Sequence, residues 1–425
     1  MKLAILGYGA EGKCVENYFK SHPYKKTSPE DIEITIFNDF TDEEIKGFKL
    51  EDFDVVFRSP SVRVHPEIKA KWTSITNYFF EECPAKIIGV TGTKGKGTTC
   101  SMSAALLESL GEKVHIVGNI GTPALDQLDK IEKDDVVVYE MSSFQLWDLK
   151  KSPFIAAVLR IEPDHLDVHK DFDDYLNAKA NIAKHQKEDS ACIYYLDNSY
   201  SVNISKISAG EKMSYPLDIS AELLEILDSL TVPGNHNRED AEAALLITYA
   251  YESKKNPENH IEFENFLKTN LGSFKQALHG YKSLPHHLEF VRELNGVKYY
   301  DDNYSSAFPS LDVAISAFGS QPIVLIAGGK DRGLDLAEMK TRIFSANNLV
   351  KAIFIGETKE KLAAGKNPKR YILVNDLKSA VEAAREIAEE NDAYVIMSPG
   401  AASFDMFKNF KDRGEKFQKI VKELK

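Results

Sequence analysis

Short runs of β-branched and aliphatic residues alternate with amphipathic stretches along this 425-residue chain, and the alternation begins afresh three times. Such runs are typical of buried strands, and strands that alternate with helices favour α/β layers around mostly parallel sheets. A chain of this length also exceeds what one hydrophobic core usually serves. We therefore predict three α/β domains in series, over residues 1–84, 85–283 and 284–425.

Each predicted domain contains several strands of this kind. The expected strands are 3–6, 34–37, 55–57, 86–90, 136–139, 156–159, 323–326, 352–355 and 394–397. A helix is expected after a glycine-rich loop that follows the strand at 86–90, because Met102, Leu106 and Leu110 recur four residues apart and Gly111 follows as a cap.

Composition and charge limit the classes of partner. The chain has 53 basic and 65 acidic residues, a formal charge of −12, which argues against a nucleic-acid-binding surface over the whole protein. No apolar run approaches the length that crosses a bilayer, and the chain enters a strand pattern at residue 3 instead of a signal peptide. Its scattered cysteines form no CxxC pair, which indicates buried, reduced thiols. We expect a cytoplasmic monomer without nucleic-acid or membrane partners.

The strongest local motif is the glycine-rich loop TGTKGKGTT at residues 91–99, between an expected strand and an expected helix. Backbone N–H groups in such a loop can hold phosphate oxygens, and the helix N-terminus adds partial positive charge. Lys96 is placed to reach the β- and γ-phosphates, and a following hydroxyl to bind Mg²⁺. A mobile surface turn is the alternative. The predicted nucleotide-binding residues of this loop are Gly92, Thr93, Lys94, Gly95, Lys96, Gly97 and Thr98.

A second, weaker motif is the GxGxxG formed by Gly7, Gly9 and Gly12 after the first expected strand. Asn38 and Asp39 end the second strand. This pattern suggests a dinucleotide-binding turn with an acid near the ribose hydroxyls. A tight strand-to-helix turn in any α/β domain explains it equally well.

Three further side chains follow strands or lie on an expected helix. Glu140 ends a run of apolar strand residues, where a carboxylate can hold Mg²⁺ directly or through water; a surface glutamate is the alternative. His165 follows another strand, and because imidazole is an unusual Mg²⁺ ligand, the residues alone favour hydrogen bonding for His165 and helix capping for Asp164. Lys179 looks like an ordinary exposed helix lysine.

Together these segments resemble the Mur ligase family, and the resemblance extends from Gly7 to Phe417. The motifs that carry it are GTKGK at 92–96, GNIG at 118–121, EMSSFQL at 140–146, PDHLD at 163–167, GNHN at 234–237, DD at 301–302, SPGAASFDMFKNF at 398–410 and RG at 413–414. The SSFQL segment and the motif at 398–410 are most similar to members that add D-glutamate to UDP-N-acetylmuramoyl-L-alanine. The resemblance implies an N-terminal Rossmann-like UDP-binding domain, a central P-loop ATPase-like domain and a C-terminal Rossmann-like domain.

The family's chemistry implies roles for the central residues. ATP phosphorylates a substrate carboxylate to an acyl phosphate, the amine of the incoming amino acid attacks it, and ADP and phosphate are released. Because two anions must approach each other, cations have to neutralise the developing charge. The resemblance implies two Mg²⁺ ions, one served by Lys96 and a loop hydroxyl and one by Glu140, His165 and Lys179. It also implies a carbamate on Lys179.

The resemblance further implies binding residues for each substrate. Those for ATP outside the loop are Asn237 and Asp302. Those for the UDP-muramoyl substrate are Gly9, Asn38, Asp39, Ser61 and Asn119. Those for glutamate are Ser306, Arg332, Ser403 and Phe410, where a guanidinium can hold the side-chain carboxylate in a fork.

Four positions depart from the family pattern. Gly97 stands where a hydroxyl residue usually follows the loop lysine, so we assign the Mg²⁺ hydroxyl to Thr98, with Thr99 as backup. The other departures are His287 for arginine, Asp240 for asparagine and Tyr304 for lysine. They put in question a phosphate contact, the selectivity for adenine and a cation of the amino-acid pocket.

Several alternative functions remain open at this point. Gly97 resembles folylpolyglutamate synthase, a relative that normally lacks such an N-terminal domain. A Mur ligase that adds L-glutamate or another amino acid fits most of the same motifs. An NAD-binding oxidoreductase would use the first glycine motif but leaves the second loop unexplained. A nucleotide-binding regulator without catalysis is the last alternative.

Overall fold

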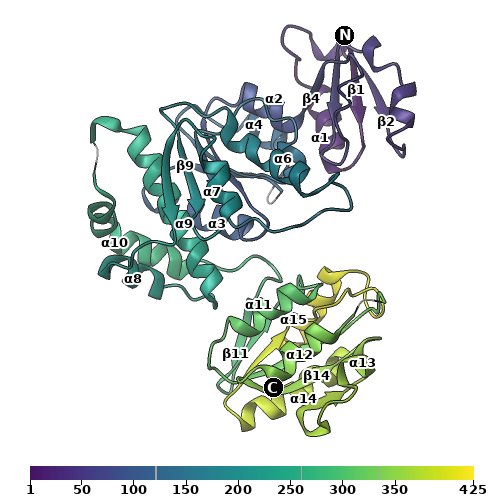
Figure 1. Ribbon diagram of the computed structural model, residues 1–425, viewed down its shortest axis with the longest axis vertical. Helices are drawn as coiled ribbons and strands as arrows, with labels where there is room; N and C mark the ends of the chain where they lie inside the picture. Colours follow the sequence, from purple (N-terminus) through teal and green to yellow (C-terminus); the bar gives the residue numbers. More distant parts are fainter. Residues whose placement is uncertain (120–121, 260, 334) are drawn as a thin grey trace. The chain divides into compact units, whose positions relative to one another are not determined.

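The computed structural model describes residues 1–119, 122–259, 261–333 and 335–425. Ile120 and Gly121 of the predicted GNIG motif lie outside the described residues. Three separate sheets occupy three successive parts of the chain (Figure 1). Every strand pair in them is parallel except one. The predicted class, α/β with mostly parallel sheets, is confirmed.

The first sheet has the strand order β2-β1-β3-β4. Its strands are β1 (Lys2–Leu6), β2 (Glu33–Phe37), β3 (Val55–Arg58) and β4 (Trp72–Ser74), and its helices are α1 (Ala10–Phe19), α2 (Ile75–Glu82) and the short η1 (Pro29–Asp31), η2 (Glu44–Gly47) and η3 (Leu50–Asp52). A Cβ atom on Gly12 would lie 2.2 Å from the carbonyl oxygen of Gly7, which has a φ of +84°. The first glycine motif therefore forms a tight turn from β1 into α1.

The central sheet has the order β10-β9-β8-β5-β7-β6 and is wholly parallel. Its strands are β5 (Lys86–Thr91), β6 (Val114–Gly118), β7 (Val136–Glu140), β8 (Ile155–Val158), β9 (Ala191–Tyr195) and β10 (Glu211–Tyr215). Its helices are α3 (Lys96–Ser109), α4 (Leu125–Leu128), α5 (Ser143–Leu146), α6 (Phe172–Lys184), α7 (Ser199–Ser205), α8 (Ala221–Asp228), α9 (Asn235–Lys255), η4 (Pro257–Asn259) and α10 (Phe263–Gly280). Because β8, β5 and β7 are neighbours, the loops that leave their carboxyl ends meet at one edge of the sheet.

The third sheet has the order β11-β12-β16-β13-β14-β15. Its strands are β11 (Glu289–Leu294), β12 (Val297–Asp301), β13 (Ile323–Ala327), β14 (Leu349–Phe354), β15 (Tyr371–Leu373) and β16 (Tyr394–Met397), and its helices are α11 (Phe308–Ser316), α12 (Ala337–Ser345), α13 (Lys359–Ala363), η5 (Pro368–Arg370), α14 (Leu377–Glu390) and α15 (Phe410–Glu423). The antiparallel pair β11–β12 turns at Asn295 and Gly296, both with positive φ. Asn-Gly is the pair that a two-residue hairpin turn favours.

The chain forms two compact units, residues 1–229 with 239–278 and residues 230–238 with 279–425. The first two sheets share a unit because α1 and α2 both pack against α4. One hydrophobic core also runs from Leu3 and Phe79 to Tyr139 and Met141. The three domain ranges inferred from the sequence therefore stay a prediction.

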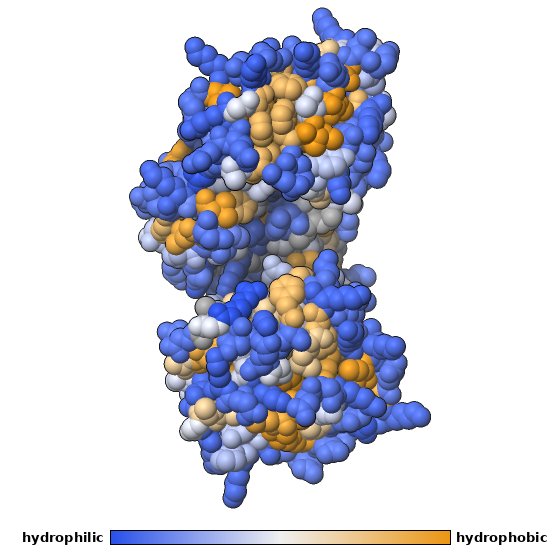
Figure 2. All heavy atoms as spheres, turned by 90° about the vertical axis from the view of Figure 1, so that its right-hand side faces the viewer, coloured by the Kyte–Doolittle hydropathy of each residue, from blue (hydrophilic) through white to orange (hydrophobic). Residues whose placement is uncertain are grey.

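On the face that Figure 2 shows, apolar side chains gather in several groups among hydrophilic ones. No helix in the described ranges is both long and apolar enough to span a bilayer. All four cysteines are free thiols, and Cys14, Cys100 and Cys192 are buried, as their scattered spacing indicated.

Candidate active site

The second glycine loop connects β5 to α3, as its sequence predicted. Gly95 is the N-cap of α3 with a φ of +83°, and a Cβ atom there would lie 2.4 Å from Oδ1 of Asp240. Lys96 folds back over the loop, and its Nζ donates to the carbonyl oxygens of Gly92 (3.1 Å) and Thr93 (2.9 Å). Burial lowers the pKa of Lys96, against the opposing charge of Glu140. A phosphate would offer this ammonium a stronger acceptor than the two carbonyls do.

The first turn of α3 separates the two candidate hydroxyls. Thr99 is buried and its Oγ1 donates to Oδ1 of Asp240 at 3.3 Å. Thr98 is half-buried on the same turn. Asp240, the acid at a position where the family pattern expects asparagine, therefore lies against the phosphate loop. Burial raises the pKa of Asp240 well above its ordinary value.

Glu140 ends β7 and is buried at the edge where β5 and β8 also end. Its Oε1 accepts from Nδ2 of Asn119 at 3.3 Å. Its Oε2 is buried and has no hydrogen-bond partner within the described part of the chain. Burial raises the pKa of Glu140, and the charge of Lys96 opposes that rise. A buried carboxylate oxygen without a donor is a ready ligand for a hard cation.

Lys179 lies on α6 and is buried, so the interpretation as an exposed helix lysine is wrong. Its Nζ donates to the carbonyl oxygen of Gly92 (2.8 Å) and to Oγ1 of Thr91 (3.3 Å), 4.7 Å from the ring centre of Tyr175. Burial and then the charge of Lys96 lower its pKa well below the ordinary value. Tyr175 and Ile182 are buried on the same face of α6, and this helical spacing was the signal available in the sequence.

His165 lies in the loop after β8 with a φ of +53°, and half of its side chain is exposed. Its ring centre is 5.0 Å from that of Phe144. The helix-capping interpretation of Asp164 is wrong, because the side chain of Asp171 caps α6 and accepts from the N–H of Asp174. Asp164 instead accepts from the backbone N–H of His165 at 2.9 Å.

Sequence reasoning missed a polar network beside this loop. His169 is buried, its Nδ1 lies 3.0 Å from Oδ2 of Asp174, and its Nε2 lies 2.9 Å from Oγ of Ser143. Arg63, from the loop after β3, pairs with the same carboxylate. The only available signal was a histidine four residues after His165, which is weak because partners distant in sequence decide its role.

The predicted UDP-binding residues of the first sheet gather at the carboxyl edge of β1 and β2. Oδ1 of Asn38 accepts from the N–H of Tyr8 at 3.0 Å, and Nδ2 of Asn38 donates to Asp39. Gly9 is the N-cap residue of the adjoining helix α1. Ser61 is exposed on the loop after β3, and the remaining predicted residue, Asn119, lies beside Glu140.

In the second unit, Asp302 is buried at the end of β12. Its Oδ2 accepts from Oγ of Ser398 at 2.6 Å, and its Oδ1 from the N–H of Leu288 at 3.2 Å. Burial raises its pKa to about 7. Asn237 lies on the first turn of α9, within residues 230–238 of the same unit, and donates to the carbonyl oxygen of Pro233 at 2.6 Å.

The predicted glutamate-binding residues lie on loops of the third sheet. The N–H of Lys330 donates to the carbonyl oxygen of Ala402 at 2.8 Å, which joins the loop that carries Arg332 to the loop that carries Ser403. Arg332 and Ser306 are exposed, whereas Ser403 is buried.

The departures His287 and Tyr304 contact each other. Their rings stack with centres 4.0 Å apart, and Phe410 meets Tyr304 edge-on at 5.4 Å. An aromatic pair therefore occupies two positions where the family pattern expects two cations.

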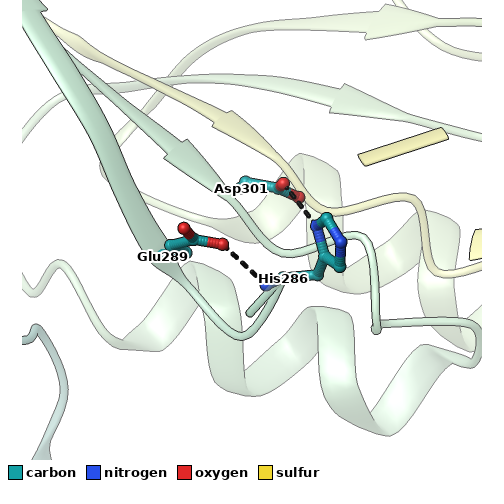
Figure 3. Close-up of side chains that lie close together, drawn as sticks. All are labelled: His286, Glu289 and Asp301. Carbon is teal, nitrogen blue, oxygen red and sulfur yellow. Dashed lines mark hydrogen bonds and ion pairs between the residues drawn. The ribbon is translucent and has the colours of Figure 1, made fainter. Parts of the chain in front are cut away.

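A second cluster could by its composition hold a metal ion: His286, Glu289 and Asp301 (Figure 3). Nδ1 of His286 donates to Oδ2 of Asp301 at 2.7 Å, and its backbone N–H donates to Oε2 of Glu289 at 2.9 Å. Nε2 of Gln418 donates to the same two carboxylate oxygens at 2.9 and 2.8 Å. Because donors already occupy these oxygens, the cluster is a hydrogen-bond network and not an open cation site.

Comparison with known proteins agrees with this geometry. Residues 90–227 match the Mur ligase middle domain. The UDP-N-acetylmuramoylalanine–D-glutamate ligase of Clostridium acetobutylicum is 32% identical over 100% of this chain and 97% of its own length. The enzyme of the same name from Clostridium kluyveri is 35% identical over 88% of this chain and 84% of its own. The chain belongs to the Mur ligase family. All four predicted catalytic residues of this Mur ligase, Lys96, Glu140, His165 and Lys179, fall within the matched middle domain.

Solved structures agree with the fold of a Mur ligase. MurC from Thermotoga maritima aligns over 100% of both chains with a TM-score of 0.58 and 15% identity. A folylpolyglutamate synthase from the same organism aligns over 76% of this chain and 90% of its own, with a TM-score of 0.52 and 13% identity. At these identities the likeness concerns the fold alone. Family membership excludes the NAD-binding oxidoreductase.

Proposed function

We propose that this Mur ligase joins D-glutamate to UDP-N-acetylmuramoyl-L-alanine, converts ATP to ADP and phosphate, and acts in peptidoglycan precursor synthesis in the cytoplasm. The observation that carries the proposal is the match to ligases of that name at 32–35% identity along 88–100% of the chain. The buried Glu140 and Lys179 beside a phosphate loop support it, because this chemistry needs charged groups held away from water.

In the proposed reaction, the alanine carboxylate attacks the γ-phosphorus of ATP and forms an acyl phosphate. The amine of D-glutamate then attacks the acyl carbon, the carbon–oxygen bond to phosphate breaks, and an amide forms. Lys96 would exchange the carbonyls of Gly92 and Thr93 for phosphate oxygens and follow the charge that develops on them. Asn119, beside Glu140, would hold the muramoyl substrate near this point.

Two Mg²⁺ ions belong to the proposal, and the residues present fit them. Thr98 would serve the ion on ATP, because the hydroxyl of Thr99 is already engaged by Asp240. Glu140, His165 and a carbamate on Lys179 would serve the other, with the unpartnered Oε2 of Glu140 as the best-prepared ligand. Mg²⁺ at these positions would neutralise charge on the oxygens that react.

The carbamate requires a neutral amine, because only an unprotonated lysine attacks CO₂. Burial lowers the pKa of Lys179 and its hydrogen-bond acceptors are neutral, and both features favour the unprotonated amine. The modification would change the charge of the site by turning a cation into an anion. An unmodified lysine cannot bind Mg²⁺ while it is protonated.

The remaining substrate contacts in the proposal follow the motif positions. Gly9, Asn38, Asp39 and Ser61 would hold the UDP group, Asn237 and Asp302 the adenosine, and Ser306, Arg332, Ser403 and Phe410 the glutamate. The proposal also includes a monomer, which light scattering would test against the chain mass of 47.7 kDa.

The experiment that tests the function is ATP-dependent phosphate release in the presence of UDP-N-acetylmuramoyl-L-alanine, with one amino acid offered at a time. D-glutamate should give the highest kcat/KM, ahead of L-glutamate, D-aspartate and glycine. A preference for L-glutamate would correct the amino acid, and turnover with a folate acceptor instead of the muramoyl substrate would indicate a folylpolyglutamate synthase. No turnover with any acceptor would contradict the enzyme assignment.

A further inference from the structure

The loops that follow β7 and β8 are tied together by one buried imidazole. His169, at the end of the loop that carries His165, lies 2.9 Å from Oγ of Ser143, the first residue of α5, which follows three residues after Glu140 at the end of β7. Because the carboxylate of Asp174 accepts from Nδ1 of His169, the neutral imidazole accepts at Nε2 from the hydroxyl of Ser143. The serine–histidine hydrogen bond therefore fixes one loop relative to the other.

The order serine, histidine, aspartate is also that of a nucleophilic triad. Here, however, Ser143 is only 2% exposed, so no substrate reaches its hydroxyl. Asp174 also pairs with Arg63 and accepts from the N–H of Lys170 at 3.2 Å. The carboxylate thus joins three partners, which suits a fixed support better than a reacting group.

Arg63 brings the first sheet into this network. Its guanidinium pairs with Asp174, donates to the carbonyl oxygen of Val168 at 3.2 Å, and lies 4.7 Å from the ring centre of Trp147. All these groups belong to the first compact unit. Through Arg63, the loop after β3 therefore packs against and stabilises the loop that carries His165.

Phe144 contacts the rings of both His169 and His165. Its ring stacks on His169 with centres 5.2 Å apart and planes 12° apart, meets the ring of Trp147 edge-on at 5.4 Å, and contacts the half-exposed ring of His165 at 5.0 Å. The carbonyl oxygen of Phe144 accepts from Nη2 of the buried Arg58 at 3.0 Å. His165 thus rests on an aromatic ring that is itself fixed on two sides.

We propose that His169, supported by Arg63 and Asp174, is a positioning residue that sets the imidazole of His165 relative to Glu140 for Mg²⁺ binding. The inference rests on the proposed function, which makes His165 and Glu140 partners at one ion. Residues that orient a metal ligand typically contribute 10–100-fold to metal affinity, about the size of effect expected here. The proposed network also connects the first sheet to the metal site, because Arg63 lies in the loop after β3.

The test is the free Mg²⁺ concentration that gives half-maximal turnover at fixed, saturating MgATP. His169→Phe keeps the aromatic stack but removes both hydrogen bonds, and Arg63→Met removes the brace from the first sheet. Each should raise that concentration by about 10-fold or more, while kcat at saturating Mg²⁺ changes much less. His169→Gln, which keeps one hydrogen bond, should lie between wild type and His169→Phe.

The matched control is His115→Phe. His115 also pairs with a carboxylate, Asp135 at 2.7 Å, in the same unit, but on β6 and not in either loop. Its substitution should leave the Mg²⁺ dependence unchanged. Electron paramagnetic resonance of Mn²⁺ bound in place of Mg²⁺ gives a second readout, which a loss of overall stability would not move.

A double-mutant cycle separates this inference from the proposed function. If His169 acts through His165, then adding His169→Phe to His165→Ala should change the Mg²⁺ dependence less than twofold. If His165→Ala itself leaves that dependence unchanged, the metal-site assignment fails. If His165→Ala shifts it but His169→Phe and Arg63→Met do not, the positioning role is refuted; Arg63→Met decides alone if His169→Phe fails to fold.

Discussion

Two buried polar clusters in this protein differ in how well their hydrogen bonds are satisfied. In the second unit, the guanidinium of Arg413 donates to Oδ1 of Asn303 (2.7 Å), to its carbonyl oxygen (3.2 Å) and to the carbonyl oxygen of Ala401 (3.1 Å). Asp301 accepts from His286, Asn303 and Gln418. In the first unit, Oε2 of Glu140 is buried with no partner in the described ranges.

This difference in hydrogen bonding distinguishes a cluster that stabilises the fold from a cluster that serves function. A satisfied network stabilises the fold, and removing one member leaves the others unpaired. An unsatisfied buried carboxylate costs folding free energy and needs another reason to persist. In the central site that reason is the cation and phosphate chemistry proposed above. The cluster in the second unit contains ligand-type residues, yet His286 and Gln418 already donate to its carboxylate oxygens.

The largest expected effect is the loss of catalysis on changing the central charges. Lys96→Ala and Glu140→Gln should each lower kcat by at least about 100–1,000-fold, because each removes a charge held where the reacting oxygens gather. Phosphate release measures this. The exposed Lys113→Ala and Glu132→Gln serve as controls and should retain wild-type turnover. Near-normal turnover of either variant would contradict the assignment of that residue to the active site.

Lys179 allows a sharper version of that test. Lys179→Ala should lose turnover by about 100-fold or more, and acetate or propionate should partly restore it by filling the vacated anionic position. Lys179→Arg should not respond, because it places a fixed cation there. Turnover is measured against acid concentration at constant ionic strength. Full activity of Lys179→Ala without added acid would refute the role in the metal site.

Substitution in the hydrogen-bonded cluster of the second unit should lower the stability of that unit. Arg413→Met leaves Asn303 and the carbonyl of Ala401 without a donor. The free energy of unfolding of the second unit should therefore fall by about 3–5 kcal/mol. Arg342→Met, which breaks a partly exposed pair with Asp312, should cost no more than about 1 kcal/mol. Hydrogen exchange in β12 and β16 reports the free energy of local opening. Equal effects of the two substitutions would remove the distinction between buried network and surface pair.

The second unit should also show a pH dependence of stability that comes from Asp302. Burial raises its pKa to about 7, so the folded state binds this proton more tightly than the unfolded state does. The stability of the second unit should therefore fall as pH rises from about 4 to 7 and level off above. Asp302→Asn should lose that part of the slope. Hydrogen exchange in β12 at pH 5 and pH 8 measures it, and identical slopes would show that Asp302 titrates normally.

Strands and loops with strong local signals were predictable from the sequence. The runs at 86–90 and 136–139 gave β5 and β7 because β-branched residues recur there, and the glycine loop lies between β5 and α3 as expected. The hairpin β11–β12 was not among the predicted strands, although Asn295-Gly296 is a favourable turn. Its strands mix polar and apolar residues, so the turn was the better signal.

The site was predictable only where a local motif marks it. The phosphate loop and Glu140 follow buried strands, and their positions follow from that context. The burial of Lys179 depends on how α6 packs, and the network of His169 joins Ser143 and Arg63 from distant parts of the chain. Contacts between residues this far apart leave no periodic pattern in the sequence, so a fold was needed to find them.

The most direct test of the central claim compares Glu140→Gln with Asp301→Asn by native-state hydrogen exchange in β7 and β12. The account predicts that Glu140→Gln leaves the opening free energy of β7 within about 1 kcal/mol of wild type, or raises it, because it removes an uncompensated buried charge. Asp301→Asn should lower that of β12 by about 3 kcal/mol, because it weakens the contacts with His286 and Gln418. If Glu140→Gln destabilised β7 as much as Asp301→Asn destabilises β12, Glu140 would be a structural residue, and the distinction between the two clusters would be wrong.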